Sequence, residues 1–319
     1  MKRVLAVALL FVFACAAEET SKTPIRVGYL PVSTSLPVML AESEGLFAKR
    51  GVTVTLERFS NSNLLISALL VGEIDATAVC ADEPILSAAV GRASPPFYIY
   101  LQELLTRDRA FDTILVPSDS SVQSVRDLSG KTLAAFPGSQ LRIYSEIILR
   151  HFEVDPSTVK IIQLAPPNML PSLFAGSVDA VLALEPIGTL AIATGKARSI
   201  AQSPIVEAIN GGEPLSAASF LLRASWAESN PEIADAFVRS VYDAADLIEA
   251  DYPRAAALYP SFTPIPEELA GKVVITRFAR IDDPDVDGLS REIELLREHG
   301  DLEGKLNPGE LIYRWSDEG

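Results

Sequence analysis

The fold rests on the stretch Leu65–Ala76, LISALLVGEIDA, and on a second stretch that reproduces it, Leu170–Ala180, LPSLFAGSVDA. The residues that align at one constant offset are Leu69 with Leu173, Gly72 with Gly176, Asp75 with Asp179 and Ala76 with Ala180. Each copy predicts a helix, a glycine stop, a buried strand and a loop that reaches Glu83-Pro84 or Glu185-Pro186. A unit used twice indicates two similar lobes with a cleft between them.

Composition and charge exclude several classes of protein. The chain has 319 residues, of which 48% are hydrophobic and 22% charged, so it is folded and long enough for two lobes. The net charge of -15 argues against a nucleic-acid partner, because phosphates would be repelled, and otherwise serves solubility. His151 and His299 have no second histidine or cysteine at metal-ligand spacing, and no nucleophile–base order or phosphate-cradling glycine loop is present. We therefore expect no catalytic residues, no metal and no cofactor.

Residues 1–17 resemble a targeting segment. Lys2 and Arg3 precede a short apolar run that fits the core of a signal peptide and is too short to span a bilayer. Residues 12–15, Val-Phe-Ala-Cys, resemble the lipobox of bacterial lipoproteins, in which Cys15 would carry the lipid. Ordinary cleavage near Ala17 is the alternative. The other cysteine, Cys80, lies in an apolar stretch and is expected to be a buried core residue.

Strands and helices alternate along the chain, which predicts an α/β fold with a mostly parallel sheet in each lobe and right-handed crossovers. Strands are expected at residues 25–30, 52–59, 75–81, 98–101, 114–116, 131–136, 159–164, 197–201 and 220–222, and helices at 37–50, 140–151, from 231 and from 283 to 300. Loops that follow such strands collect at one edge of the sheet, where ligands of open α/β folds bind.

The chain is similar to a known family at several places. Residues 41–52, AESEGLFAKRGV, resemble the opening of periplasmic solute-binding proteins of ABC importers, in the branch that serves nitrate, sulfonates, taurine, thiamine-pyrimidine precursors and riboflavin. Residues 125–131, VRDLSGK, resemble the segment that opens the second lobe in that family, and the paired Gly-x-x-Asp-Ala units are typical of it. The resemblance covers nearly the whole mature chain.

The resemblance implies a two-lobe, type II-like binding protein that carries a small solute to an ABC permease in the inner membrane. Lobe 1 would comprise residues 24–108 and 222–319, and lobe 2 residues 109–221. The first crossing between the lobes would lie within residues 106–113 and the second near residues 219–222. The protein would be a periplasmic or membrane-anchored monomer, and closure of the lobes on the solute would signal to the transporter.

Candidate ligand-binding residues come from the loops at the two cleft edges. The hydroxyl, amide and glycine candidates are Ser33, Thr34, Ser35, Asn61, Ser62, Gly138, Ser139, Gln140 and Asn168. The aromatic candidates Phe59 and Phe136 could stack on a ring or belong to the cores. Ser35, Asn61, Ser62 and Asn168 could instead cap helices.

The acidic candidates are Asp82, Glu83 and Glu185, which lie at matching places in the two repeat copies. Carboxylates at loop ends are often simply solvated, and for Asp82 that is the safer interpretation. If Glu83 and Glu185 face the solute, they disfavour a small anion, because the ligand loops contain no lysine or arginine and Arg142 is the nearest base. We therefore expect a neutral or cationic solute with N–H groups, such as a pyrimidine or another heterocycle.

Three alternatives remain at this stage. The solute could be a sulfonate- or nitrate-type anion. The chain could be an enzyme on the same fold, of the menaquinone-pathway or thiamine-pyrimidine type, since fold alone does not settle function. It could also be a sensor that binds a solute and signals through a partner. Turnover of a solute would favour the enzyme, and a stoichiometric, unchanged ligand would favour a binding protein.

Overall fold

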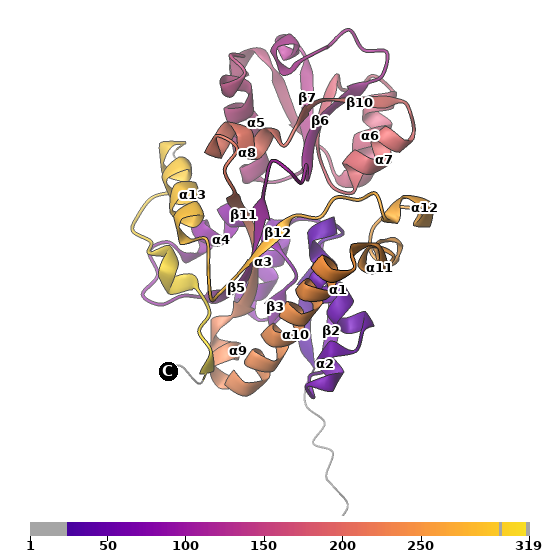
Figure 1. Ribbon diagram of the computed structural model, residues 1–319. Helices are drawn as coiled ribbons and strands as arrows, with labels where there is room; N and C mark the ends of the chain where they lie inside the picture. Colours follow the sequence, from indigo (N-terminus) through magenta and orange to yellow (C-terminus); the bar gives the residue numbers. More distant parts are fainter. Residues whose placement is uncertain (1–23, 300–301, 317–319) are drawn as a thin grey trace, which may run out of the picture.

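A computed structural model describes residues 24–299 and 302–316 of the chain. Within these residues the strands form two separate sheets. The larger has the order β12-β5-β11-β3-β1-β2, with β4 paired to β11, and the smaller has the order β10-β6-β9-β7-β8. We call the larger sheet with its helices lobe 1 and the smaller sheet with its helices lobe 2; Figure 1 shows lobe 2 above lobe 1.

The elements have the following bounds. The strands of lobe 1 are β1 (Ile25–Tyr29), β2 (Val54–Arg58), β3 (Ala76–Thr77), β4 (Cys80–Ala81), β5 (Phe97–Leu105), β11 (Leu215–Arg223) and β12 (Arg277–Arg280). Those of lobe 2 are β6 (Asp112–Pro117), β7 (Thr132–Ala135), β8 (Lys160–Gln163), β9 (Ala180–Leu184) and β10 (Ala197–Gln202). The helices of lobe 1 are α1 (Leu36–Ser43), α2 (Leu46–Lys49), α3 (Ser62–Val71), α4 (Asp82–Ala89), α9 (Ala224–Ser229), α10 (Pro231–Ala250), α11 (Tyr252–Ala256), α12 (Glu267–Ala270) and α13 (Val286–Glu298), and those of lobe 2 are α5 (Ser139–His151), α6 (Pro166–Phe174), α7 (Ile187–Ala193) and α8 (Pro204–Asn210). Short 3-10 turns lie at Ser33–Ser35, Val125–Leu128, Pro156–Thr158, Tyr259–Ser261 and Pro308–Leu311.

The two sequence repeats occupy equivalent places in the two lobes. Parallel pairing sets Val27 of β1 beside Ala76 of β3, and Leu133 of β7 beside Ala180 of β9. Gly72 and Gly176 both end a helix with positive φ, 79° and 69°, a conformation that glycine adopts without a side-chain clash. The repeat prediction is therefore confirmed at the level of strand pairing.

The aspartates of the two repeats make the same contact. Asp75 accepts a hydrogen bond from the Arg26 backbone N–H at 3.2 Å, and its own N–H donates to the Arg26 carbonyl oxygen at 2.8 Å. Asp179 accepts from the Thr132 N–H at 2.8 Å and donates to the Thr132 carbonyl at 3.0 Å. Each aspartate thus holds the N-terminal end of the strand that pairs in parallel with the strand of its own repeat, β1 for Asp75 and β7 for Asp179.

The sheets are mixed, which corrects the expectation of mostly parallel sheets. In lobe 1, β1 pairs in parallel with β2 and β3, whereas β11 is antiparallel to β3, β4 and β5, and β12 to β5. In lobe 2, β7 is parallel to β8 and β9, whereas β6 is antiparallel to β9 and β10. The antiparallel strands are those next to the segments that connect the lobes, where the chain changes sheet and does not return through a helix.

The antiparallel pair β5–β11 joins the lobes, and Figure 1 shows these strands running up from lobe 1 toward lobe 2. They pair from Leu215 and Leu105 to Arg223 and Phe97, so residues 219–222, which were expected to cross, lie inside a strand of lobe 1. Leu105 and Leu215 are nevertheless buried in the core of lobe 2. The lobe boundaries given above therefore stay predictions.

Several helices and strands have other bounds than the sequence predicted. The helix expected over residues 37–50 breaks into α1 and α2, because Gly45 adopts the left-handed conformation. The strand expected over residues 75–81 is split into β3 and β4. The Glu83-Pro84 loop of the first repeat is the first turn of α4, and residues 166–168 open α6 instead of forming a loop.

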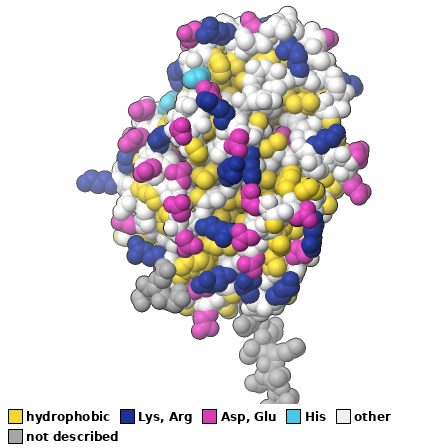
Figure 2. Space-filling view, in the orientation of Figure 1, with side chains coloured by type: hydrophobic (Ala, Val, Ile, Leu, Met, Phe, Trp, Pro, Cys, Tyr) yellow, Lys and Arg dark blue, Asp and Glu magenta, His cyan; other side chains and the backbone are white. Residues whose placement is uncertain are grey.

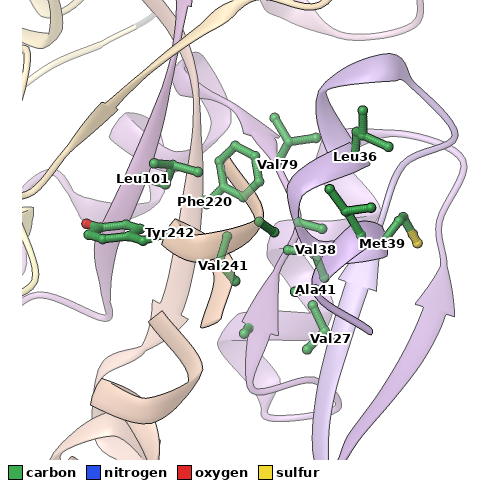
Figure 3. Close-up of a cluster of buried hydrophobic side chains, with 14 of the residues drawn as sticks. Val27, Leu36, Val38, Met39, Ala41, Val79, Leu101, Phe220, Val241 and Tyr242 are labelled. Carbon is green, nitrogen blue, oxygen red and sulfur yellow. The ribbon is translucent and has the colours of Figure 1, made fainter. Parts of the chain in front are cut away.

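The core of lobe 1 packs the β-sheet against α1 and α10, and Figure 3 shows part of this cluster. Leu36, Val38 and Val241 are fully buried in it. Phe237 of α10 stacks on Phe47 with ring centroids 5.1 Å apart. Burial of such side chains supplies most of the favourable free energy of folding.

The surface carries charges of both signs. Figure 2 shows acidic and basic side chains interspersed over one face of the molecule. Many of them pair across elements, for example Arg109 with Glu249 and Arg277 with Asp108, both at 2.8 Å. Among the described residues, no helix is both long and apolar enough to cross a membrane.

Candidate functional site

A small cleft, with a cavity volume of about 110 Å³, is lined by both lobes and by the strands that join them. Lobe 1 contributes Leu30, Val32, Thr34, Ser60, Asn61, Ser62, Asn63, Val79, Ala81, Glu83 and Pro84. Lobe 2 contributes Phe111, Phe136, Pro137, Gly138, Ser139, Gln140, Leu141, Tyr144, Pro166, Leu184 and Ile205, and the joining strands contribute Glu103, Leu105, Ala217 and Ala218. Most of these side chains are apolar, and the polar ones lie mainly at residues 60–63 of lobe 1 and at the start of α5.

The N-terminus of α5 faces the Glu83 side chain across the cleft. α5 begins at Ser139, directly after Gly138, whose φ of 138° few other residues adopt. The Ser139 hydroxyl donates a hydrogen bond to the Glu83 carboxylate, and the Glu83 backbone N–H donates to Gln140 Oε1 at 2.9 Å. Free N–H groups and the helix dipole favour negative charge at such an end. In this chain that negative charge comes from the protein's own Glu83.

Gln140 starts a buried hydrogen-bond chain that crosses the molecule. Its amide donates to Tyr144 Oη at 2.9 Å and to the Ala217 carbonyl at 2.7 Å. The Tyr144 hydroxyl donates to Glu292 Oε2 of α13, also at 2.9 Å. Burial, followed by the nearby charge of Asp82, raises the pKa of Glu292 to about 8. The chain holds α5 in place relative to the joining strands and α13.

Glu103 is the cleft residue that sequence reasoning missed. It lies on β5, two residues before Leu105 and on the same face of the strand, and it is 4% exposed. Its Oε1 has no hydrogen-bond partner among the described residues. Burial, and then the charge of Asp82, raises the pKa of Glu103 well above its usual value. The signal in the sequence was an acid inside an apolar strand, FYIYLQELL, but the predicted strand ended before it at Leu101.

Asp82 lies behind the cleft and does not line it. It is fully buried, and it accepts hydrogen bonds from the hydroxyls of Ser219 at 2.7 Å and Ser216 at 2.9 Å. Burial raises the pKa of Asp82 to about 7 against the opposing effect of these bonds. The expectation that Asp82 is solvated is therefore wrong. Its two partners on β11 are more than 130 positions away in sequence, so no local pattern announces them.

Glu185 lies in a second, outer groove that continues from the cleft. The groove shares Val32, Ser60, Phe136 and Pro166 with the cleft and is rich in proline and aromatic residues. Phe59 and Glu185 line only the groove, whereas Phe136 lines both. Burial raises the pKa of Glu185 to about 7. Glu83 and Glu185 thus occupy connected but different parts of the space between the lobes.

The serine and asparagine candidates of lobe 1 take different roles. Asn61 caps α3 by accepting from the Leu64 N–H at 3.0 Å, and Ser62 accepts from the Ala81 N–H at 3.1 Å; both also line the cleft. Thr34 lines the cleft, but Ser33 and Ser35 do not. Ser35 makes no cap bond, and its hydroxyl instead donates to the carbonyls of Leu30 and Ala78. The cap prediction thus holds for Asn61, whereas Ser35 has the predicted N-cap position of α1 without a side-chain cap bond.

The remaining candidates lie apart from the cleft. Asn168 is exposed in the first turn of α6, outside the lining of both the cleft and the groove. Arg142 forms an ion pair with Glu146 of its own helix at 2.9 Å and does not line the cleft. Cys80 is buried and unpaired, as expected. Among residues 24–299 and 302–316, no group of histidine, cysteine or acidic side chains could hold a metal ion.

The cleft is acidic. Its charged lining residues are Glu83 and Glu103, and the part of the chain that the structure describes contributes no lysine or arginine to it. The carboxylates of Asp82 and Glu292 lie just behind it and raise the pKa of buried neighbours. A ligand in this cleft would therefore meet hydrogen-bond acceptors and apolar walls, with hydroxyl and amide groups of residues 60–63 at one side, because the Ser139 hydroxyl and the Gln140 amide already donate to protein groups.

The fold is that of the periplasmic binding proteins. The periplasmic aliphatic sulphonate binding protein SsuA of Escherichia coli superposes with a TM-score of 0.73 at 19% identity, covering 92% of each chain. The nitrate-binding protein NrtA of Synechocystis PCC 6803 superposes with a TM-score of 0.69 at 15% identity, covering 90% of this chain and 84% of that one. Two mixed sheets with flanking helices and an intervening cleft are common to this class.

The chain belongs to the NMT1-like family, whose family model matches residues 18–259. The taurine-binding periplasmic protein of Escherichia coli is 24% identical over 74% of this chain and 70% of its own length. The nitrate import ATP-binding protein NrtC of Synechococcus elongatus is 27% identical over 75% of this chain, which spans only 37% of that protein. The resemblance to solute-binding proteins of ABC importers is thereby confirmed.

Proposed function

We propose that this protein is the extracytoplasmic solute-binding component of an ABC importer, which captures a small organic solute between its lobes and delivers it to a membrane permease. The observation that carries the proposal is the cleft, to which both lobes contribute. Glu83 of lobe 1 and Ser139 and Gln140 of lobe 2 hydrogen-bond to each other beside it. A solute that touches both sides would stabilise the closed arrangement by its differential affinity, which a permease can read.

The chemistry of the cleft supports a neutral or cationic solute with N–H groups, such as a pyrimidine or another heterocycle. Two carboxyl groups line the cleft without a basic residue, and Glu83 already occupies the N-terminus of α5, where an anion would otherwise be favoured. Phe136 at the junction of the cleft and the groove can stack on a flat ring.

A sulfonate- or nitrate-type anion is the second candidate. The relatives named above, which are described as binding taurine, aliphatic sulphonate and nitrate, support it. For an anion to bind, Glu83 would have to leave α5 or be protonated, because its carboxylate would repel the ligand at that point. The two candidates therefore differ in the charge of the solute, which a binding experiment can distinguish.

A thermal-shift panel followed by calorimetry should separate these candidates. We expect aminopyrimidines and related N–H-bearing heterocycles to raise the melting temperature, because a ligand that binds only the folded protein stabilises it. Taurine, methanesulfonate and nitrate should leave it unchanged. Native mass spectrometry of freshly purified protein would identify any solute that co-purifies. Tight binding of a sulfonate with no binding of any heterocycle would disprove the solute preference but leave the importer role intact.

The same experiment tests the enzyme and sensor alternatives. A bound solute that is recovered unchanged, one per protein, supports a binding protein. Conversion of the solute by the purified protein would instead show an enzyme on this fold. A solute-dependent interaction with a signalling partner, and none with a permease, would show a sensor.

The site of action is a further prediction, which falls on residues 1–23, outside the described part of the chain. We propose that residues 1–17 direct export and that Cys15 carries a lipid anchor on a monomeric protein. Expressed in a bacterial host, the wild-type protein should partition with membranes, whereas Cys15→Ala should be released into the soluble fraction. Size-exclusion chromatography of that soluble form checks the monomer. Equal membrane partitioning of both forms would argue against the anchor.

A further inference from the structure

We propose that Glu103, at the junction of the two lobes, is the residue that recognises the solute, by accepting a hydrogen bond or an ion pair from an N–H group at the floor of the cleft. The inference rests on the proposed function, which it deepens by naming the anchoring residue. The sequence suggested that loop residues recognise the solute, whereas Glu103 lies within strand β5, which joins the lobes.

One carboxyl oxygen of Glu103 has no hydrogen-bond partner among the described residues. A buried polar atom that lacks a hydrogen bond costs about 1–3 kcal/mol, so natural structures rarely retain one without a use. Glu103 Oε1 has no donor among the described residues, although the side chain is 4% exposed. The other acid of the cleft, Glu83, is bonded to the hydroxyls of Ser139 and Ser87. Glu103 is therefore the acid in the cleft that has an acceptor left for a ligand.

Glu103 lies on a strand that joins the lobes and lines the cleft between them. Glu103 pairs with Ala218 of β11, and both residues line the cleft together with Leu105 and Ala217. These cleft-lining neighbours are apolar. The Thr276 hydroxyl lies close enough to Glu103 to lower its pKa slightly, but neither Glu103 Oε1 nor Thr276 Oγ1 has a partner at hydrogen-bond geometry among the described residues. In contrast, the preceding residue, Gln102, uses its amide on Ser216 at 3.1 Å and on the Asp285 carbonyl at 3.3 Å. One residue of the strand is thus tied into the scaffold, while the next lines the cleft and has a carboxyl oxygen without a donor.

A buried carboxyl group at this position would also discriminate between solutes. A buried carboxyl group binds an N–H donor more strongly than a solvated one, because the local dielectric is low and water does not compete for its oxygens. A solute lacking the N–H group would leave Glu103 unpaired, so selectivity against it would be large. The expected solute therefore combines an N–H or cationic group at Glu103 with an apolar body that reaches Phe136.

The test compares Glu103→Gln with a matched control, Asp235→Asn. Asp235 is also a buried acid, but it is bonded to Tyr313 and Ser316 on the far side of α10 and does not line the cleft. The probes are 4-aminopyrimidine and benzamidine, which carry N–H donors, with pyrimidine and methanesulfonate for comparison. We expect calorimetry to show that Glu103→Gln weakens binding of the N–H probes at least tenfold and that Asp235→Asn changes it less than twofold.

A second readout needs no ligand. Since Glu103 lacks a partner, Glu103→Gln should leave the melting temperature of the unliganded protein unchanged or raise it, whereas Asp235→Asn should lower it. Glutamine keeps the shape of the side chain, so misfolding is not expected. A lower melting temperature for Glu103→Gln would show that Glu103 has a structural role and would overturn the inference.

The outcomes for this inference and for the proposed function are distinct. If 4-aminopyrimidine binds and Glu103→Gln binds it equally well, the role of Glu103 is disproved while the importer proposal stands. If only methanesulfonate binds, both Glu103 and the N–H solute are wrong, and the importer proposal again stands. If no probe and no co-purified solute binds to the wild-type protein, the inference and the proposed function both fail.

Discussion

Replacing Asp75 by alanine is expected to lower the free energy of unfolding of lobe 1 by about 2–4 kcal/mol, because it leaves two arginines without their buried partner. Asp75 is 3% exposed and accepts hydrogen bonds from Arg26 Nε at 3.0 Å, Arg26 Nη2 at 2.9 Å and Arg223 Nη2 at 2.6 Å. Burial alone would raise the pKa of Asp75, but the two guanidinium groups outweigh it and hold that pKa below its usual value. The partial exposure of Arg26 keeps the expected loss below that of a fully buried pair.

The second repeat supplies the matched control, Asp179→Ala. Asp179 makes the same backbone contact with Thr132, but its ion pair with Lys131 is long, 3.8 Å, and both side chains are about 40% exposed. Such a pair contributes little, so the expected loss is about 1 kcal/mol, mainly from the lost hydrogen bond. Urea unfolding at neutral pH measures both variants. If the lobes unfold separately, each effect belongs to the transition of its own lobe. Equal losses at the two positions would contradict the prediction.

Lowering the pH from 8 to 5 is expected to raise the melting temperature by about 5–10 °C, a few kcal/mol for a chain of this size. Burial raises the pKa values of Asp82, Asp112 and Glu185 to about 7 and that of Glu292 to about 8. Because these pKa values are higher in the folded than in the unfolded chain, the folded state binds more protons between the two values. Their stabilising contribution is thus fully present below the unfolded pKa and is lost as the pH rises through 7 to 8.

Below about pH 4 the trend should reverse. Hydrogen bonds from arginines and backbone N–H groups lower the pKa values of carboxylates such as Asp75 and Asp127, and protonating these carboxylates removes stability. The maximum is therefore expected near pH 5. Melting curves from pH 3 to 9 measure it.

A pair of variants separates buried acids from overall charge. Asp112 is buried and accepts from the Ile205 N–H at 2.9 Å, a bond that an asparagine oxygen can also accept. Asp112→Asn should flatten the slope between pH 5 and 8, whereas Asp119→Asn, at an exposed position, should leave it unchanged. A slope that responds equally to both variants, and that disappears at high salt, would show that general charge repulsion causes it.

The local features of the fold could be predicted because their causes are local. Alternation in residues 25–30 predicted β1, and the Pro231 start predicted α10. Gly72 and Gly176 ended their helices as expected. The breaks that were missed depend on tertiary contacts or single dihedrals. Gly45 divides one expected helix, and Val79, at a φ of 113°, separates β3 from β4.

The candidate site could be predicted in part. Residues 138–140 and Glu83 were expected at a cleft edge, because loops after parallel strands meet there, and the structure brings them into contact. Glu185 was expected to share the cleft but lies in the outer groove. Glu103 was missed, because the sequence pattern does not show which face of β5 turns to the space between the lobes.

The sequence by itself determined the two-lobe α/β fold, since the paired Gly-x-x-Asp-Ala units and the alternation of strands and helices express short-range rules of backbone and burial. The tertiary structure alone decided which acids matter. Asp75 became an ion-pair centre and Asp82 a bonded core residue, because Arg223, Ser216 and Ser219 approach them from distant β11. Glu103 kept an oxygen without a hydrogen bond because no donor of the described residues reaches it at bonding geometry. The charge state and availability of a carboxyl group depend on what surrounds it in three dimensions, and sequence spacing does not encode that.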